Sequence, residues 1–314
     1  MQLAAAIDIG GTNTVFGLVD CDGIVRYEGK IKTTAYPQPE ELVKEVSSQI
    51  LANLGDHRLI GAGIGAPNGN YFRGTIEFAP NLNWYGVIPL ADMFRTALGC
   101  EALVTNDANA AALGEMVFGG ARGMKDFIFI TLGTGLGSGI VVNGKMVYGH
   151  DSFAGELGHV IVEPNGRQCG CGRKGCLETY ASATGIKRTY SDLLMSRHKH
   201  ADIDDKVADA RYIFDKAVSG DMQAVEAFKY TGDILGLALA NAVAITSPEA
   251  IFLFGGLAQA GHFIFEPTIE SFEHNLLNIY KGKVKVLPSK LKESDAALLG
   301  AASLAWQQAL AEQV

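Results

Sequence analysis

The sequence predicts an α/β protein of two domains with mixed sheets, and three observations support this. Segments typical of strands alternate with segments typical of helices in both halves of the chain. Residues 7–19 and 130–142 look like copies of one hairpin, in which a turn rich in Gly and Thr joins two apolar strands. A length of 314 residues suits two domains, and a hydrophobic share of 48% supports substantial cores.

The first half is expected to hold three strands within residues 3–31, joined by tight turns. Pro39 opens an amphipathic helix that continues to about Leu54. Short strands are expected at 59–65 and 103–104, and a helix follows the second of them.

The second half repeats this order after a glycine-rich stretch at 119–123, where we expect the break between the domains. Its elements are expected as a second hairpin at 127–142, a Gly-rich segment at 150–180 with few regular elements, helices over 183–245, strands at 250–254 and 284–286, and a C-terminal helix capped by Asp295. Strands that alternate with helices in both halves indicate mixed sheets.

Composition and charge argue against several classes of protein. A net charge of −8 disfavours a general nucleic-acid binder, which usually carries a basic face. The N-terminal residues lack the basic region of a signal peptide, and the longest apolar helix, near 234–245, is too short to span a bilayer. We therefore expect a cytoplasmic protein that binds neither nucleic acid nor a membrane. Three of the five cysteines are clustered, which in a reducing compartment indicates a metal site rather than disulfides.

Both hairpin turns are of a kind that holds phosphate. Glycine lets backbone N–H groups approach a phosphate closely, and Thr hydroxyls add donors. The residues expected to contact a nucleotide are Gly10, Gly11, Thr12 and Asn13 in the first turn and Gly133, Thr134 and Gly135 in the second. Ordinary hairpin chemistry explains one such turn well but two paired turns poorly. The pair therefore predicts one nucleotide held from two sides, in a cleft between two related halves.

Asp8 lies two residues before the first glycine of the first turn. A carboxylate beside bound phosphates would be repelled unless Mg²⁺ lies between them. We therefore assign Asp8 to Mg²⁺, in direct contact or through water.

The most specific motif combines one histidine with the three clustered cysteines. Cys171 follows Cys169 by two residues, Cys176 follows by five more, and His159 precedes Cys169 by ten. Three thiols and one imidazole supply four ligands for a tetrahedral Zn²⁺. Four protein ligands leave no open position on the ion, so this zinc is expected to be structural. Unliganded, partly buried thiols are the alternative.

Two glutamates flank this motif. Glu156 precedes His159 by three residues, and Glu178 follows Cys176 by two. A fixed metal would hold both carboxylates on one rigid wall, where they can accept hydrogen bonds from sugar hydroxyls. His159 is expected to bind zinc through one nitrogen and to reach the sugar with the other. Loop carboxylates bound to backbone or solvent are the alternative.

Asn106 and Asp107 lie between an apolar strand and a helix. Strand ends are where α/β sheets gather ligand groups. An Asp at this place can take the proton of a hydroxyl that attacks a phosphate, and an Asn beside it can bind a neighbouring hydroxyl. Asp and Asn are also common helix N-caps, and the residues alone leave the two roles equally open.

Several motifs occur together in an order typical of one family. They are the two phosphate motifs Asp8-Ile9-Gly10-Gly11-Thr12 and Leu132-Gly133-Thr134-Gly135-Leu136-Gly137, the adenosine motif Leu253-Phe254-Gly255-Gly256-Leu257-Ala258, and the sugar and zinc segment with Glu156-Leu157-Gly158-His159, Cys169-Gly170-Cys171 and Cys176-Leu177-Glu178. With them the chain resembles, over nearly its whole length, the ROK family of sugar kinases within the actin/hexokinase-type ATPase superfamily.

The resemblance implies two actin-like (ribonuclease H-like) domains that flank a central cleft. It implies a smaller N-terminal domain at 1–118 that also takes up the last helix at about 295–314, and a larger domain at 119–294 with the zinc-binding segment. A homodimer is the expectation that the family gives.

The resemblance also assigns roles to residues of this chain. It favours Asp107 as the catalytic base over a helix cap, and it makes Asn106 a sugar ligand. Asn81, in the Ala79–Trp84 loop, matches another sugar-contacting residue, and Gly255 and Gly256 match the adenosine motif.

The function expected is ATP-dependent phosphorylation of a hexose, glucose to glucose 6-phosphate, with Mg²⁺ and a structural Zn²⁺. The same chemistry on N-acetylmannosamine, N-acetylglucosamine or fructose is the first alternative, because the sequence does not measure the room for an acetamido group. A non-catalytic sugar-responsive regulator is the second; the family's repressors carry an N-terminal helix-turn-helix domain, whereas here the phosphate strand begins within ten residues of Met1. The donor (ATP or polyphosphate), the oligomeric state and allosteric regulation stay open.

Overall fold

The computed structural model describes residues 1–197 and 209–311. The chain divides into two compact units: unit 1 holds Met1–Met124, Lys145–Gly155 and Lys290–Val314, and unit 2 holds Lys125–Gly144 and Glu156–Ser289. Residues 145–155 therefore group with the N-terminal part of the chain, whereas the sequence analysis placed them in the larger domain. The units are also similar in length, so the expected difference in size is not seen.

A mixed sheet forms the centre of unit 1. Its strands are β1 (Gln2–Ile9), β2 (Asn13–Val19), β3 (Val25–Lys32), β4 (Arg58–Gly65) and β8 (Ala102–Thr105), in the order β3-β2-β1-β4-β8. β2 pairs antiparallel with β1 and β3, whereas β4 runs parallel to β1 and β8. The strands expected from the sequence in this half are confirmed.

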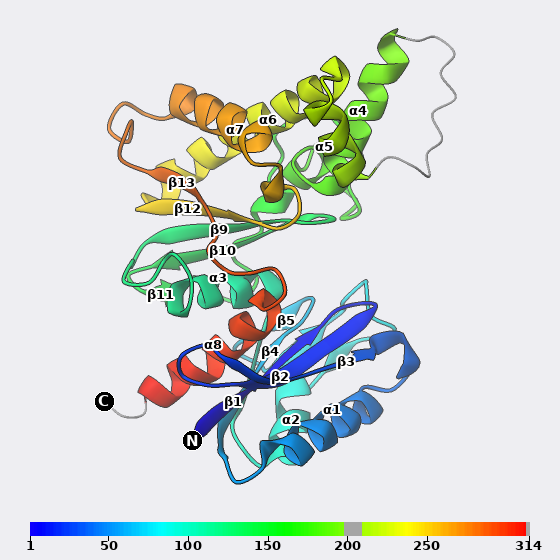
Figure 1. Cartoon of the computed structure of the whole chain (residues 1–314), viewed down its shortest axis with the longest axis vertical. Coiled ribbons are helices and arrows are strands. Elements are labelled where there is room, and N and C mark those ends of the chain that lie inside the picture. The colour runs from blue at the N-terminus through cyan, green and yellow to red at the C-terminus, as the bar shows by residue number, and fades with distance from the viewer. Residues whose placement is uncertain (198–208, 312–314) are drawn as a thin grey trace. The chain divides into compact units, whose positions relative to one another are not determined.

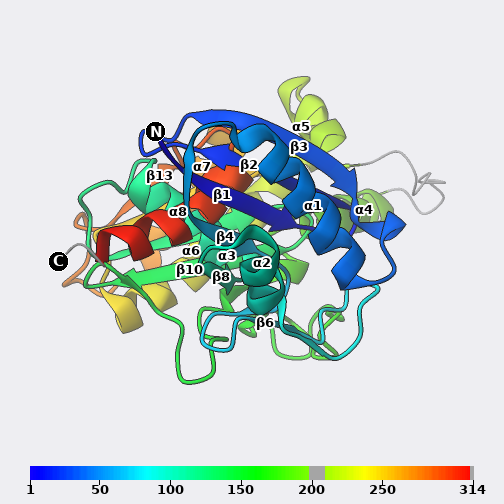
Figure 2. The same cartoon turned by 90° about the horizontal axis from the view of Figure 1, so that it is seen from below.

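Helices cover both faces of this sheet. α1 (Pro39–Leu54) and α2 (Leu90–Leu98) lie side by side on one face, and α3 (Asp107–Val117) and α8 (Ala296–Ala311) lie on the other (Figure 1, Figure 2). Gly63 of β4 is needed at its position, because a Cβ there would collide with the Ala301 carbonyl of α8. This close approach lets α8 pack directly on the sheet.

A small antiparallel sheet in unit 1 carries the loop with Asn81. Its strands are β5 (Gly69–Asn70), β6 (Thr75–Glu77) and β7 (Val87–Ile88). In the loop between β6 and β7, Leu82 and Trp84 are buried, and the Trp84 indole N–H donates to the Tyr36 carbonyl at 3.1 Å. These contacts hold the loop against the core of unit 1. Tyr36 directly follows the 3₁₀ turn η1 (Thr33–Ala35), so the loop is attached next to that turn.

The sheet of unit 2 repeats the order of the first. β9 (Phe127–Leu132) pairs antiparallel with β10 (Leu136–Val142) and parallel with β12 (Ala250–Phe254), which runs parallel to β13 (Lys285–Pro288). The order β10-β9-β12-β13 therefore matches β2-β1-β4-β8 in sequence and direction. The second hairpin is confirmed as a structural copy of the first. The short strand β11 (Lys145–Met146) lies in the segment that belongs to unit 1.

In the described part of unit 2, four helices lie on one side of the sheet (Figure 1). They are α4 (Ala183–Arg197), α5 (Ala210–Val218), α6 (Met222–Thr246) and α7 (His262–Asn275). α6 packs against the other three, and Gly232 and Gly236 let it approach Pro267 and Thr268 of α7 closely. The helices expected over 183–245 are confirmed apart from residues 198–208, which lie outside the described part of the chain.

The other regular elements that the structure describes in unit 2 are single 3₁₀ turns. They are η2 (Leu157–His159), η3 (Leu177–Thr179) and η4 (Ala258–Ala260). Within residues 1–197 and 209–311, the search for a helix with the length and apolar character needed to cross a membrane finds none.

Candidate active site

The first glycine turn joins β1 to β2 in unit 1. Gly10 donates its N–H to the Asn13 carbonyl at 2.9 Å, and the Thr33 hydroxyl donates to the Gly10 carbonyl at 2.7 Å. A Cβ on Gly11 would stand only 2.5 Å from the Asn81 carbonyl oxygen. The turn is therefore anchored from η1, and the loop with Asn81 lies directly on it. The structure thus brings the expected phosphate turn and one expected sugar ligand together within unit 1.

Two carboxylates lie near Gly65, at the carboxyl ends of the parallel strands β1, β4 and β8. The Cβ position of Gly65 is 3.2 Å from Asp8 Oδ1 and 3.8 Å from Asp107 Cα. Burial raises the pKa of Asp8 to about 7, and the negative charge of Asp107 adds to the rise. The pKa of Asp107 also lies above its usual range, because the surrounding protein removes water from its carboxyl group. Part of the residue stays accessible to solvent. Two such carboxylates repel each other unless a proton or a cation neutralises one of them.

The start of α3 orients Asn106 and Asp107. Asn106 is the N-cap, and its Oδ1 accepts the Asn109 N–H at 2.7 Å. Asp107 is the first residue of the helix, and its Oδ1 accepts the Ala108 N–H at 2.8 Å. The capping bond uses the amide oxygen of Asn106 and leaves its NH₂ group to donate to another partner. Asn106 is therefore the cap, and capping does not occupy Asp107 Oδ2.

The second glycine turn joins β9 to β10 in unit 2. Gly133 donates its N–H to the Gly135 carbonyl at 3.1 Å, and the Thr184 hydroxyl donates to the Thr134 carbonyl at 2.8 Å. The turn is therefore held from α4, which leaves the Thr134 side chain free of this contact. All three residues expected to bind phosphate in this half belong to one fixed turn.

A cavity of about 300 Å³ opens beside the second glycine turn. Its walls include Gly133 and Thr134 of that turn and Gly256 of the turn that follows β12. The Leu257 N–H donates to the Leu132 carbonyl at 3.3 Å and joins the two strand ends. Because β9 and β12 are parallel neighbours, the cavity lies where α/β sheets gather their ligands. The second phosphate motif and the expected adenosine motif thus meet at one cavity.

The helical wall of this cavity was missed by the sequence analysis. Ala183 of α4, Arg211 and Phe214 of α5 and Gln259 of η4 line it. Gln259 follows the Gly255–Gly256 turn by three residues, so its position next to the adenosine motif could have indicated a residue of the binding site. The α5 residues had no such signal, because only the packing of α5 on α6 brings them to the strand ends.

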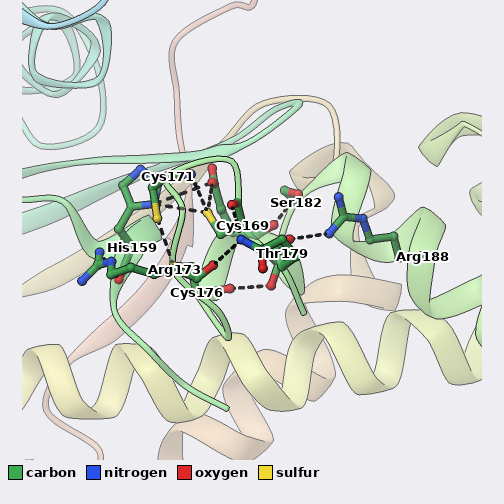
Figure 3. A network of polar contacts seen from close by, with 10 residues as sticks. His159, Cys169, Cys171, Arg173, Cys176, Thr179, Ser182 and Arg188 are labelled. Atoms are coloured by element: carbon green, nitrogen blue, oxygen red, sulfur yellow. Dashed lines mark hydrogen bonds and ion pairs between the residues drawn. The ribbon is translucent and has the colours of Figure 1, made fainter. Parts of the chain in front are cut away.

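The expected metal ligands come together in unit 2 (Figure 3). The ligand atoms of His159, Cys169, Cys171 and Cys176 all lie within 4.8 Å of one another. The Sγ atoms of Cys171 and Cys176 are 3.6 Å apart, and Cys169 Sγ is 3.7 Å from His159 Nδ1. Two sulfur ligands of a tetrahedral zinc stand about 3.8 Å apart for Zn–S bonds of about 2.3 Å. The donor set and its spacing therefore fit a zinc ion with four protein ligands.

Two arginines that the sequence analysis did not single out hold the metal loop. Arg167 Nη1 donates to the Thr179 carbonyl at 3.0 Å, and its guanidinium lies 4.7 Å from the centre of the Tyr180 ring. Arg173 Nη2 donates to the His159 carbonyl at 2.8 Å. Hydrogen bonds from Arg173 also lower the pKa of the Cys171 thiol to about 6. A thiol that deprotonates readily favours metal binding.

Glu178 connects the cysteine cluster to the second glycine turn. Its Oε1 lies 3.0 Å from Cys169 Sγ and 3.6 Å from His159 Nδ1, and its Oε2 lies 2.8 Å from the Cβ position of Gly135. Burial, and then the hydrogen bond to this carboxylate, raise the pKa of the Cys169 thiol. Residues assigned from sequence to sugar, metal and nucleotide are therefore direct neighbours in unit 2.

Glu156 is fixed next to His159. Its carbonyl accepts the His159 N–H at 3.0 Å, so both residues share the turn η2. The Leu157 N–H donates to the Ser138 hydroxyl at 3.1 Å and ties this turn to β10. The sheet of unit 2 thereby positions the first part of the motif, and η3 positions Glu178.

Two units with one strand order, each with a glycine turn after its first strand, define a two-domain α/β protein of the actin-like fold, as in the solved structures of its relatives. The chain belongs to the ROK family, whose model matches residues 4–308.

Curated relatives and solved structures match over nearly the whole chain. A glucokinase of Thermotoga maritima is 37% identical over 305 residues, which are 95% of each protein. An N-acetylmannosamine kinase of Shigella boydii is 32% identical and covers 96% of this chain and 97% of its own. The structure of a ROK family glucokinase from Streptomyces griseus in complex with glucose and AMPPNP is 34% identical, with a TM-score of 0.78 over 97% of this chain and 99% of that one. A ROK family transcriptional regulator, a homolog of the E. coli MLC protein, is 26% identical, with a TM-score of 0.86 over 98% of this chain and 78% of that one.

Proposed function

We propose that this protein is a glucokinase that transfers the γ-phosphoryl group of ATP to glucose and forms glucose 6-phosphate. The observation that carries the proposal is the pair of carboxylates near Gly65, at the carboxyl ends of parallel strands in a ROK family chain. In phosphoryl transfer to an alcohol, one carboxylate can accept the proton of the hydroxyl, and a second can bind the divalent cation. The glucokinase relatives, at 37% and 34% identity, support glucose as the acceptor.

Asp107 is the proposed catalytic base. As the glucose hydroxyl forms its bond to the γ-phosphorus, the Asp107 carboxylate accepts the hydroxyl proton. The bond from the γ-phosphorus to the bridging oxygen breaks, and ADP leaves with the electron pair. A pKa above the usual range of Asp, raised by burial, makes the Asp107 carboxylate a stronger base than an ordinary carboxylate.

Each unit has residues that are proposed to bind a sugar. In unit 1, the amide NH₂ group of Asn106 that the cap leaves unused can donate to a hydroxyl, and Asn81 is anchored beside the first turn. In unit 2, Glu156 and Glu178 are proposed to accept hydrogen bonds from hydroxyls. His159 has its Nδ1 toward Cys169 and Glu178, so its Nε2 is the proposed contact to the sugar.

Zn²⁺ is proposed to be held by His159, Cys169, Cys171 and Cys176. The donor set and the distances among the four ligand atoms support this assignment. Because four protein ligands close the coordination shell, the ion would contribute rigidity and no chemistry. The metal loop would hold Glu156 and Glu178 in place, and these two carboxylates would bind the sugar hydroxyls.

Mg²⁺ is proposed to be held next to Asp8, in direct contact or through water. Burial and the charge of Asp107 raise the pKa of the Asp8 carboxyl to about 7, and a cation bound beside it would relieve the repulsion between the two carboxylates. The ion would neutralise charge on the β- and γ-phosphates. Thr12, Asn13 and Gly11 of the first turn and Thr134 and Gly133 of the second are the proposed phosphate donors, with Gly10 and Gly135 shaping the turns.

ATP is the proposed phosphate donor. The cavity beside Thr134 and Gly256 has an apolar lining with aromatic residues, which suits a purine base and which a polyphosphate chain would not use. The family's structure with AMPPNP supports the same choice. Gly255 and Gly256 shape the turn at the edge of this cavity.

One specific observation favours a second candidate function. The N-acetylmannosamine kinase of Shigella boydii is 32% identical over nearly the full length. The same catalytic groups would then act on an amino sugar, and the room beside the acetamido group would decide between the two acceptors. We also propose that the protein is a cytoplasmic homodimer; a reducing compartment keeps the three cluster thiols available for metal. Light scattering that finds only monomer would overturn the dimer.

The test is ADP release from Mg-ATP across glucose, mannose, fructose, N-acetylmannosamine and N-acetylglucosamine, with Asp107→Asn in parallel. We expect glucose to give the highest kcat/KM and the variant to lose turnover with every sugar. Highest turnover with N-acetylmannosamine would favour the second candidate. A folded, metal-loaded protein that turns over none of these sugars would contradict a sugar kinase.

A further inference from the structure

The cavity beside the second glycine turn has a distinct polar side chain at its rim. Its apolar walls include Leu132, Phe214, Phe228 and Leu257. Aromatic and aliphatic side chains of this kind stack on any flat base, because every base has a π face. The apolar walls therefore accept a purine without choosing between adenine and guanine.

Three polar side chains line the cavity in the described part of the chain, and two of them are accounted for. Thr134 belongs to the proposed phosphate turn. The Arg211 guanidinium stands 3.3 Å from Asp215 Oδ1 and 5.3 Å from the centre of the Phe214 ring, so it is engaged along α5. The third is Gln259, an exposed side chain whose carboxamide takes no part in these contacts.

Gln259 is presented by a fixed turn. In η4, the Ala258 N–H donates to the Gly255 carbonyl at 2.9 Å, and the Ala260 N–H donates to the Leu257 carbonyl at 3.2 Å. Gly255, at φ +99°, has its Cβ position 2.8 Å from the Leu132 carbonyl, so the turn that precedes η4 is tied to the end of β9. These contacts fix the backbone from which the Gln259 side chain extends, so the side chain starts from a defined place in the cavity wall.

We propose that Gln259 determines the preference of this protein for adenine over guanine nucleotides. The inference rests on the proposed function in that the cavity is taken as the site of the nucleobase. A carboxamide offers one donor and one acceptor side by side, and adenine offers the complementary pair, its N6 amino group and a ring nitrogen. Guanine has O6 in place of that amino group and carries its own amino group at C2, where adenine has only a hydrogen. No carboxylate or other acidic side chain lines the described part of the cavity to accept from the C2 amino group. A polar group left unpaired in an apolar cavity weakens binding.

The decisive variant is Gln259→Glu, which keeps the shape and exchanges the donor for a second acceptor. A carboxylate can accept from the N1–H and the amino group of guanine together, and it has no donor for the ring nitrogen of adenine. Gln259→Leu removes both functions and keeps the volume. Gln2→Glu is the matched control, because it makes the same change of charge at an exposed position in unit 1.

The experiment measures Kd for ATP and GTP by calorimetry in the absence of sugar, and kcat/KM for both with the best sugar. We expect the preference for ATP, given by kcat/KM for ATP over that for GTP and by Kd for GTP over that for ATP, to fall at least about 10-fold in Gln259→Glu. It is expected to fall less in Gln259→Leu and to stay unchanged in Gln2→Glu. Equal ratios in all variants, or no binding of either nucleotide, would overturn the proposal. Altered Kd ratios with no sugar-dependent turnover would support the base assignment and contradict the glucokinase, so the two failures are distinguishable.

Discussion

The two glycine turns occupy equivalent places in two sheets of one topology, yet the residue two positions before each turn differs in kind. Unit 1 has Asp8 ahead of Gly10, and unit 2 has Thr131 ahead of Gly133. The pKa of the Asp8 carboxyl is raised to about 7, whereas the Thr131 hydroxyl accepts the Gly137 N–H at 3.0 Å. An acidic side chain with a raised pKa therefore precedes the first turn, whereas a neutral side chain that accepts a backbone hydrogen bond precedes the second.

The following strands differ in the same sense. β8 of unit 1 leads directly into α3 and its carboxylate at Asp107, whereas its counterpart β13 leads to Ser289, which donates its N–H to the Leu253 carbonyl at 2.9 Å. The duplicated backbone therefore gives each unit a similar glycine turn, and the side chains around the two turns differ. Unit 1 carries the Asp8 and Asp107 carboxyl groups at its strand ends, and unit 2 carries the cysteine cluster and the apolar cavity. The lesson is that equivalent strand ends hold different chemistry.

Asp107→Asn is expected to have the largest effect. It keeps the shape of the side chain and removes the proton acceptor, so kcat is expected to fall by about 10²–10⁴-fold with a smaller change in the sugar KM. Steady-state kinetics with a coupled ADP assay measures both, and thermal unfolding checks that the variant is folded. A kcat within threefold of the wild-type value, on the order of measurement error, would remove Asp107 from the role of base.

Removing a metal ligand is expected to harm unit 2 selectively. Cys176 is fully buried, and Cys176→Ser is expected to abolish stoichiometric zinc and to lower the apparent Tm by roughly 5–10 °C, because a structural metal contributes folding free energy. Elemental analysis and calorimetry measure the two effects. Cys21→Ser is the control, since Cys21 is exposed and belongs to no motif. A zinc-free protein with unchanged Tm would contradict the structural role.

A matched pair of glycines tests the contact between the second turn and Glu178. A Cβ on Gly135 meets the Glu178 carboxylate at 2.8 Å, whereas within the described chain a Cβ on Gly133 meets nothing within 4 Å. Gly135→Ala is therefore expected to destabilise the protein by about 1–3 kcal/mol, and Gly133→Ala to leave stability nearly unchanged. Chemical denaturation of both variants decides the question. Equal stabilities would show that Glu178 moves aside without cost.

Asp8 is expected to give the smallest effect, and one that depends on pH. Its pKa is about 7 in the folded protein against 3.8 for the free residue, so the folded state holds a proton that the unfolded chain releases between these values. Without added Mg²⁺, the free energy of unfolding is therefore expected to fall as pH rises from 4 to 7. Asp8→Asn removes this loss and is expected to be more stable by about 1–2 kcal/mol at pH 8, and equally stable near pH 4.

The control for Asp8 comes from the equivalent position in unit 2. Thr131→Val lacks a titrating group at either pH, so its stability relative to the wild type is expected to be independent of pH. Thermal unfolding across pH 4–8 compares the three proteins. Added Mg²⁺ is expected to raise the Tm of the wild type at pH 8 and not that of Asp8→Asn, because the carboxylate holds the cation. A wild-type profile that is flat in pH would contradict the raised pKa.

Much of the fold and part of the site followed from the sequence, because they depend on near neighbours along the chain. The hairpins and their turns could be predicted from the alternation of apolar residues and from glycines at the turns. The metal cluster could be predicted because His159 and Cys176 lie within one short Gly-rich segment, so a local loop is enough to gather the ligands. For the same reason Asn106 and Asp107 were found at a strand end, although only the structure assigned the cap to Asn106.

The rest was decided by tertiary packing, because it joins residues that no local pattern relates. Glu178 meets Gly135 across 43 positions, α5 brings Arg211 and Phe214 to the ends of β9 and β12, and residues 145–155 group with unit 1. Local hydrogen bonds depend on the spacing of apolar residues and on the propensity of each residue for helix, strand or turn, and both can be judged within one short segment. Contacts between distant segments depend on how complete surfaces fit together, and that fit exists only once the sheets and helices have packed.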